Sequence, residues 1–132
     1  MLRTQVNPRL SRWLAVALYC IAIFIQSASP ATPSLPAWPG MDKVLHFTAY
    51  ALLGILFFRA YQTTDLNHKP VRLAVASILS AALYGLSDEI HQSFVPWRNA
   101  EALDLAADTL GALVAVLVWQ FRVNGCLPSN SK

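Results

Sequence analysis

Acidic, imidazole, amide and guanidinium side chains crowd into residues 84–98, at the end of an apolar run. Glu89 and His91 are of the types that act as general acids and bases. Gln92 adds an amide, and Arg98 adds a guanidinium that can hold a phosphate through two parallel hydrogen bonds. Ionisable groups at the boundary of an apolar run are costly to keep there, so this stretch is a candidate functional site.

A second polar group lies at the start of the preceding apolar run. Asp42 and His46 are four residues apart, so they share one face of a helix. A carboxylate in that position can orient an imidazole and raise its basicity, which makes His46 a second candidate base. Asp42 and Lys43 are candidate ligand-binding residues. Two structural alternatives stay open: Asp42 caps the helix, or His46 is a hydrogen-bonded packing residue.

A third group lies inside the last apolar run. Asp104, Asp108 and Gly111 share a helix face, and Asp108 is too deep to be a cap. Two carboxylates on one inward face suggest a divalent-metal site or a proton-sharing pair. They could instead clamp Arg98, as part of an ion-pair network that only ties the helix ends together. No other cofactor is indicated.

The elements that must position these groups are four apolar segments. The 132-residue chain is 55% hydrophobic and only 13% charged, against about 25% charged in soluble domains. A membrane-spanning helix needs about 20 apolar residues. We therefore predict an all-α protein, a single domain over 1–132 that folds as a four-helix transmembrane bundle, with spans at about 10–28, 43–61, 71–88 and 101–121.

The charge distribution predicts the orientation of these spans. The net charge is +3, and the basic residues gather before the first span, around the loop after the second and behind the last. Excess Lys and Arg mark the cytoplasmic side, so both termini are expected in the cytoplasm and the acidic groups outside. The basic ends are thus explained by topology, and no nucleic-acid partner is expected. Four prolines in the first outer loop (Pro30, Pro33, Pro36 and Pro39) are spaced for a polyproline II connector.

Three segments together resemble a known family. DKVLHF from Asp42, SDEIHQSFVPWR ending at Arg98 and DLAADTLG ending at Gly111 are similar to the VanZ-like family of small bacterial membrane proteins. The resemblance implies a multi-pass protein of the bacterial cytoplasmic membrane, and a founding member is linked to resistance to the glycopeptide teicoplanin. Trp97 departs from the pattern, because the family often has glycine or another small residue before the arginine.

We expect the polar groups to converge in one pocket between the outer ends of the second, third and fourth spans. This pocket would recognise a lipid, a lipid-linked or phosphate-bearing precursor, or a cell-wall-related ligand, with membrane lipids as its surroundings. Alternatively, it would act as an enzyme on a phosphate-bearing lipid or cell-wall precursor. The sequence leaves the ligand and the oligomeric state open. The residues expected in the pocket are Asp42, His46, Glu89, His91, Gln92, Arg98, Asp104 and Asp108.

Overall fold

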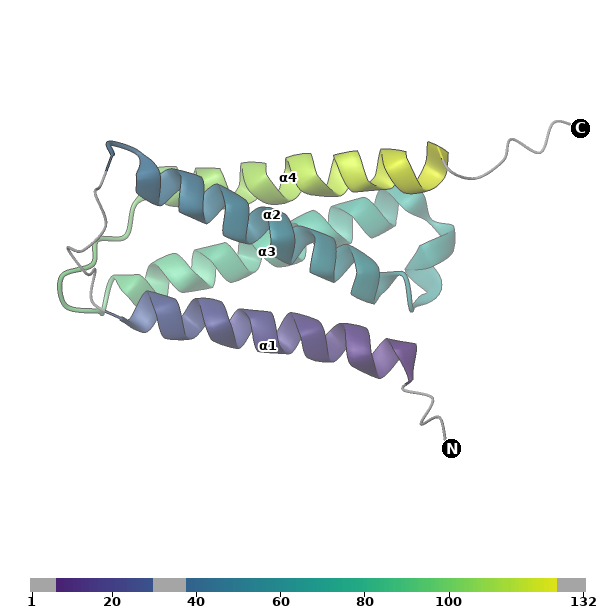
Figure 1. Ribbon diagram of the computed structural model, residues 1–132, viewed down its shortest axis with the longest axis horizontal. Helices are drawn as coiled ribbons and strands as arrows, with labels where there is room; N and C mark the ends of the chain where they lie inside the picture. Colours follow the sequence, from purple (N-terminus) through teal and green to yellow (C-terminus); the bar gives the residue numbers. More distant parts are fainter. Residues whose placement is uncertain (1–6, 30–37, 126–132) are drawn as a thin grey trace, which may run out of the picture.

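A computed structural model describes residues 7–29 and 38–125 of the chain (Figure 1). Within them lie four long helices and one short 3-10 helix, and no strand. The helices are α1 (Pro8–Ala28), α2 (Met41–Tyr61), η1 (Asp65–His68), α3 (Pro70–Gln92) and α4 (Ala102–Gly125). All four α-helices are long and apolar enough to cross a membrane. The predicted fold is confirmed: the chain is a multi-pass, four-helix membrane protein.

Local sequence explains where the helices begin. Asn7 caps α1 by accepting a hydrogen bond from the Arg9 amide, and proline occupies the first turn of both α1 and α3. Gly40, at a φ of 87°, turns the chain into α2 in a conformation that glycine adopts without strain. The observed helices match the expected spans within two residues at most ends. The exceptions are α3 and α4, which each continue four residues past their expected ends at 88 and 121.

The helices pack as a bundle with α1 and α4 on opposite sides. α2 and α3 contact each other and both outer helices (Figure 1). α2 and α4 approach each other closely at Gly111, where an added Cβ would overlap the carbonyl oxygen of Phe47. Small residues allow such close approach between membrane helices. Large apolar side chains cover the outside of the bundle, as a lipid environment requires, among them Leu14, Leu18, Leu79, Leu83 and Val118.

The interior differs from one end of the bundle to the other. We call the end where α1 and α3 finish and α2 and α4 start the site end, and the opposite end the apolar end. The apolar end is filled by Phe58, Leu73, Ala74 and Val116. Among the described residues, six of the seven buried polar side chains belong to the site end: Ser27, Asp88, Glu89, Gln92, Asp104 and Asp108.

The remaining expectations about the chain have separate outcomes. Ser77, Ala81 and Gly85 are buried on α3, so a stripe of small residues faces the bundle. Pro30, Pro33 and Pro36 lie outside the described residues, and Pro39 lies in the turn before α2. The cytoplasmic placement of both termini stays a prediction.

Candidate functional site

The centre of the site end is a contact between His46 of α2 and Asp108 of α4. The imidazole Nδ1 lies 2.9 Å from Asp108 Oδ1, and the Asp108 side chain is fully buried. Asp108 fits because α3 has no side chain at Gly85, where a Cβ would lie 2.8 Å from Asp108 Oδ2. The sequence predicts that Asp42 orients His46, but the partner of His46 is Asp108. Asp42 lies one turn nearer the start of α2 and pairs with Lys43 instead.

Lys43 gathers the outermost carboxylates. Its ammonium Nζ lies 2.8 Å from Asp42, 2.8 Å from Glu101 and 2.9 Å from Asp104. Asp42 and Glu101 are exposed, whereas the Asp104 side chain is only 7% exposed. Lys43 thus joins the start of α2 to the start of α4. Asp104 contacts Lys43 and also lies 3.9 Å from His46 Nε2, whereas Asp108 contacts His46 Nδ1, and the Asp104–Asp108 metal pair stays a prediction.

Glu89 approaches the same imidazole from α3. Its Oε2 accepts a 2.9 Å hydrogen bond from the Glu101 amide, which fixes the carboxylate. Its Oε1 lies 4.0 Å from His46 Nδ1 and has no hydrogen-bond partner among the described residues. Three helices therefore each supply one titratable side chain to a small buried volume.

A second polar group joins α3 to α1. Asp88 Oδ2 accepts hydrogen bonds from Ser27 Oγ at 2.8 Å and from Gln92 Nε2 at 3.0 Å, and all three side chains are buried. Asp88 and Gln92 are four residues apart and so share a face of α3. The contribution of α1 was missed from the sequence, because a serine near a helix end gives no signal of its own.

Arg98 extends from the α3–α4 loop over this group. Its Nε and Nη2 donate to the carbonyl oxygens of Ser29 and Gln26, at 3.2 and 3.1 Å. Among the described residues no carboxylate forms a salt bridge with Arg98, so the alternative in which Asp104 or Asp108 clamps Arg98 is not observed. The preceding residue, Trp97, has a φ of 68°, in the left-handed region that favours glycine. This observation accounts for the small residue that the family resemblance leads one to expect there.

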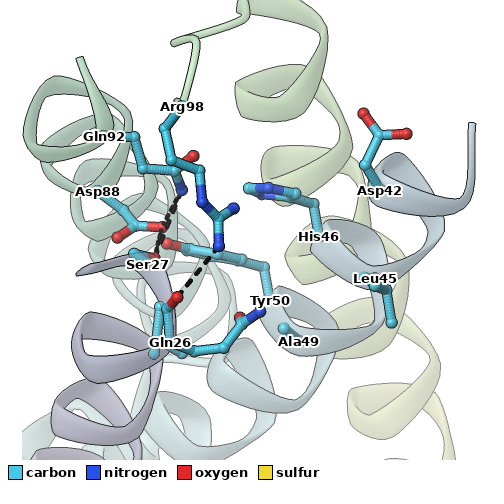
Figure 2. Close-up of a pocket in the computed structure, with 11 residues that line it drawn as sticks. Gln26, Ser27, Asp42, Leu45, His46, Ala49, Tyr50, Asp88, Gln92 and Arg98 are labelled. Atoms are coloured by element: carbon cyan, nitrogen blue, oxygen red, sulfur yellow. Dashed lines mark hydrogen bonds between the residues drawn. The ribbon is translucent and has the colours of Figure 1, made fainter. Parts of the chain in front are cut away.

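A pocket of about 100 Å³ lies beneath Arg98, between α1, α2 and α3. Figure 2 shows the guanidinium pointing into it, between Gln92 on one side and His46 on the other. Asp42 lies at the rim, with its carboxylate turned away from Arg98. The lining combines polar and apolar side chains: Ile23, Gln26, Ser27, Asp42, Leu45, His46, Ala49, Tyr50, Asp88, Gln92 and Arg98.

The structure brings together most of the predicted site residues, but not all. Asp42, His46, Gln92 and Arg98 line the pocket, and Glu89, Asp104 and Asp108 lie beside His46. His91 lies apart, with its ring stacked on Phe24 of α1 at 4.5 Å between centroids. Two residues along a helix is a rotation of about 200°, so His91 and Glu89 face opposite ways.

Comparison with known proteins places this arrangement in a family. The family model described as VanZ/LLP1 matches residues 4–123. An uncharacterized protein of the fission yeast Schizosaccharomyces pombe is 31% identical over 104 residues, covering 78% of this chain and 60% of the relative. The chain thus spans about three fifths of the length of that relative. No solved structure matches the chain.

Proposed function

The chain belongs to the VanZ/LLP1 family, and we propose that its pocket binds the phosphate-bearing head group of a membrane lipid or lipid-linked precursor. The observation that supports this most strongly is the state of Arg98. Its guanidinium is held over the pocket by two neutral carbonyl groups, although six carboxylates lie at the same end of the bundle. Its positive charge is therefore directed at the pocket without a bonded anion among the described residues.

The chemistry of guanidinium fits a phosphate oxygen. Arginine carries five N–H donors in a planar fork, and the two recorded bonds leave donors for a ligand. Paired N–H groups bind phosphate bidentately. Gln92 lines the same pocket, where its Nε2 donates to Asp88 and Ser27. The nearby Asp88 carboxylate favours a head group that also presents a hydroxyl or an ammonium group.

The pocket also has an apolar side that suits the rest of a lipid. Ile23, Leu45 and Ala49 line it, and Leu45 is 53% exposed toward the surface that lipid covers. A volume of about 100 Å³ takes a head-group fragment only. The acyl chains would stay outside, along the apolar faces of α1 and α2.

We further propose that the site end faces away from the cytoplasm, because the basic residues gather beyond the other end. In a bacterial cytoplasmic membrane, head-group binding there would alter the envelope surface met by a glycopeptide such as teicoplanin. The fission yeast relative favours phospholipid chemistry over peptidoglycan chemistry, since only the former is common to yeast and bacteria.

A second candidate function is catalysis on the same ligand. It is favoured by the 2.9 Å contact between His46 and Asp108, since a carboxylate-oriented imidazole is a common general base. His46 lines the pocket, so a bound phosphate would lie within its reach.

One experiment tests the proposal and separates the two functions. Purified full-length protein is incubated in detergent with phosphatidylglycerol or with diacylglycerol of the same acyl chains, and bound lipid is measured by native mass spectrometry. We expect retention of phosphatidylglycerol and not of diacylglycerol, with the lipid mass unchanged. Equal retention of both lipids would refute head-group recognition. A new lipid product, suppressed by chelator or by His46→Gln, would establish the enzyme instead.

A further inference from the structure

His46, which lines the pocket, meets acidic side chains from two other helices. His46 Nδ1 lies 2.9 Å from Asp108 Oδ1 and 4.0 Å from Glu89 Oε1. One donor atom from each of the three lies within 4.8 Å of the other two. Donors bound to one tetrahedral zinc ion at 2.0–2.2 Å are about 3.3 Å apart, so shifts on the order of 1 Å would bring this set onto an ion.

The second observation is a pair of buried oxygens without partners. Glu89 Oε1, which faces His46, and Asp108 Oδ2 make no hydrogen bond among the described residues. The two side chains are only 7% and 0% exposed. Buried carboxylate oxygens almost always have a partner, because burying one unpaired costs several kcal/mol, about 2–7 by transfer estimates. Each orphan oxygen therefore points to a cation or a proton.

The local charge favours a cation. Glu89 and Asp108 face one imidazole, and Lys43 is already bound by Asp42, Glu101 and Asp104. The other positive group of the site, Arg98, is directed to carbonyl oxygens. Two carboxylates thus lack a fixed positive charge, which a divalent ion would supply.

We infer that His46, Glu89 and Asp108 form a binding site for one divalent transition-metal ion, with zinc the best fit. One imidazole nitrogen and two carboxylate oxygens are donors that zinc accepts, whereas calcium and magnesium prefer oxygen alone. The neighbouring set of Asp42, Glu101 and Asp104 is a poor metal site, because the Lys43 ammonium lies between those carboxylates.

Three protein ligands would leave a fourth position on the ion. His46 also lines the pocket, so that position is next to the volume beneath Arg98. Zinc sites with three protein ligands and one open position are typical of catalysis. The metal site does not depend on head-group binding, and it can exist whether or not a lipid is turned over.

The test uses zinc alone on the purified, chelator-treated full-length protein, without added lipid. We expect one zinc ion per chain by isothermal titration and elemental analysis, and a higher melting temperature with zinc. Glu89→Gln and Asp108→Asn keep side-chain shape and should each weaken zinc binding by at least about tenfold. The matched control is Glu101→Gln, an acidic side chain at the same end, which should bind zinc as the wild type does.

Absence of stoichiometric zinc binding in the wild type would overturn the inference, as would unchanged binding in both variants. If the variants do not fold, X-ray absorption spectroscopy of the zinc-loaded wild type identifies the ligands of the ion. One imidazole and two carboxylates in the first shell would support the site, and sulfur or several imidazoles would overturn it. Because no lipid is present, failure here is distinct from failure of head-group binding.

Discussion

The two ends of the bundle differ in the side chains that fill the space between the helices. At the apolar end, Phe58, Leu73, Ala74 and Val116 fill the interior with hydrocarbon. At the site end, carboxylates, an imidazole and an amide fill it, and two carboxylate oxygens have no partner among the described residues. The apolar end shows that these helices pack without buried charge. The charges at the site end therefore need a reason other than packing, and in membrane proteins that reason is usually function.

The hydrogen bonds of the two ends differ in the same way. At the apolar end, the Tyr61 and Ser80 hydroxyls lie 2.9 Å apart, a neutral bond at the edge of the hydrocarbon cluster. At the site end, the 2.9 Å contact joins His46 to a fully buried carboxylate. Neutral bonds between membrane helices contribute on average about 0.6 kcal/mol. Removing one partner of a buried charged pair costs more, because the other charge stays behind.

The largest expected effect follows from this contrast. His46→Leu should destabilise the protein by about 3–5 kcal/mol, because Asp108 then loses its partner. Adding Asp108→Val should restore the free energy of unfolding to within about 1 kcal/mol of the wild type, while abolishing zinc binding. The measurement is unfolding by SDS titration in mixed micelles. The matched cycle is Tyr61→Phe with Ser80→Ala, and a coupling there as large as that of His46 with Asp108 would break the comparison.

The next largest effect concerns the close approach of α4 to α2 at Gly111, which positions the side chains of the site. Gly111→Val should cost about 3 kcal/mol, because the new side chain meets the Phe47 carbonyl and forces α4 away from α2. The control is Ala106→Val, which adds similar volume to an exposed position of the same helix. The free energy of unfolding should be nearly unchanged by the control. Equal losses in both variants would mean that the α2–α4 contact does not set the geometry.

The smallest effect on stability concerns the loop that presents Arg98. Trp97→Gly should stabilise the protein by about 0.5–1 kcal/mol, because the left-handed φ of 68° strains a bulky residue and not glycine. Phe94→Gly, at an equally exposed position without positive φ, should bring no gain. Both are measured by the same SDS titration. Loss of stability in Trp97→Gly would show that the indole anchors the loop more strongly than its backbone strains it.

The sequence predicts the fold of this protein better than the pairing within its site. Four apolar runs of spanning length leave little choice of architecture, and charged residues inside them stand out. The pairing depends on how the helices rotate against one another, which hydropathy does not record. The residue that orients His46 is Asp108, 62 positions away along the chain. Gly85 and Gly111 make this contact possible, because they let α4 pack close to α3 and α2.

The role of α1 was also beyond the reach of the sequence. Ser27 is an ordinary residue near a helix end, and its importance comes only from the 2.8 Å hydrogen bond to Asp88. On the sequence alone, His91 is grouped with the site because it is close to Asp88 and Glu89 along the chain, beyond the predicted end of the third span at 88. Once α3 continues to Gln92, the helical rotation directs His91 toward Phe24 of α1.

The central claim is that Arg98 serves a ligand and not the scaffold, and Arg98→Lys tests it most directly. Lysine keeps the charge but cannot bind phosphate bidentately. We expect a free energy of unfolding within about 0.5 kcal/mol of the wild type. Retention of phosphatidylglycerol should fall about 10- to 100-fold, the equivalent of one charged hydrogen bond. Arg72→Lys, at the exposed start of α3, should change neither quantity. Unchanged lipid retention in Arg98→Lys, or a loss of stability that Asp108→Asn restores, would contradict the claim.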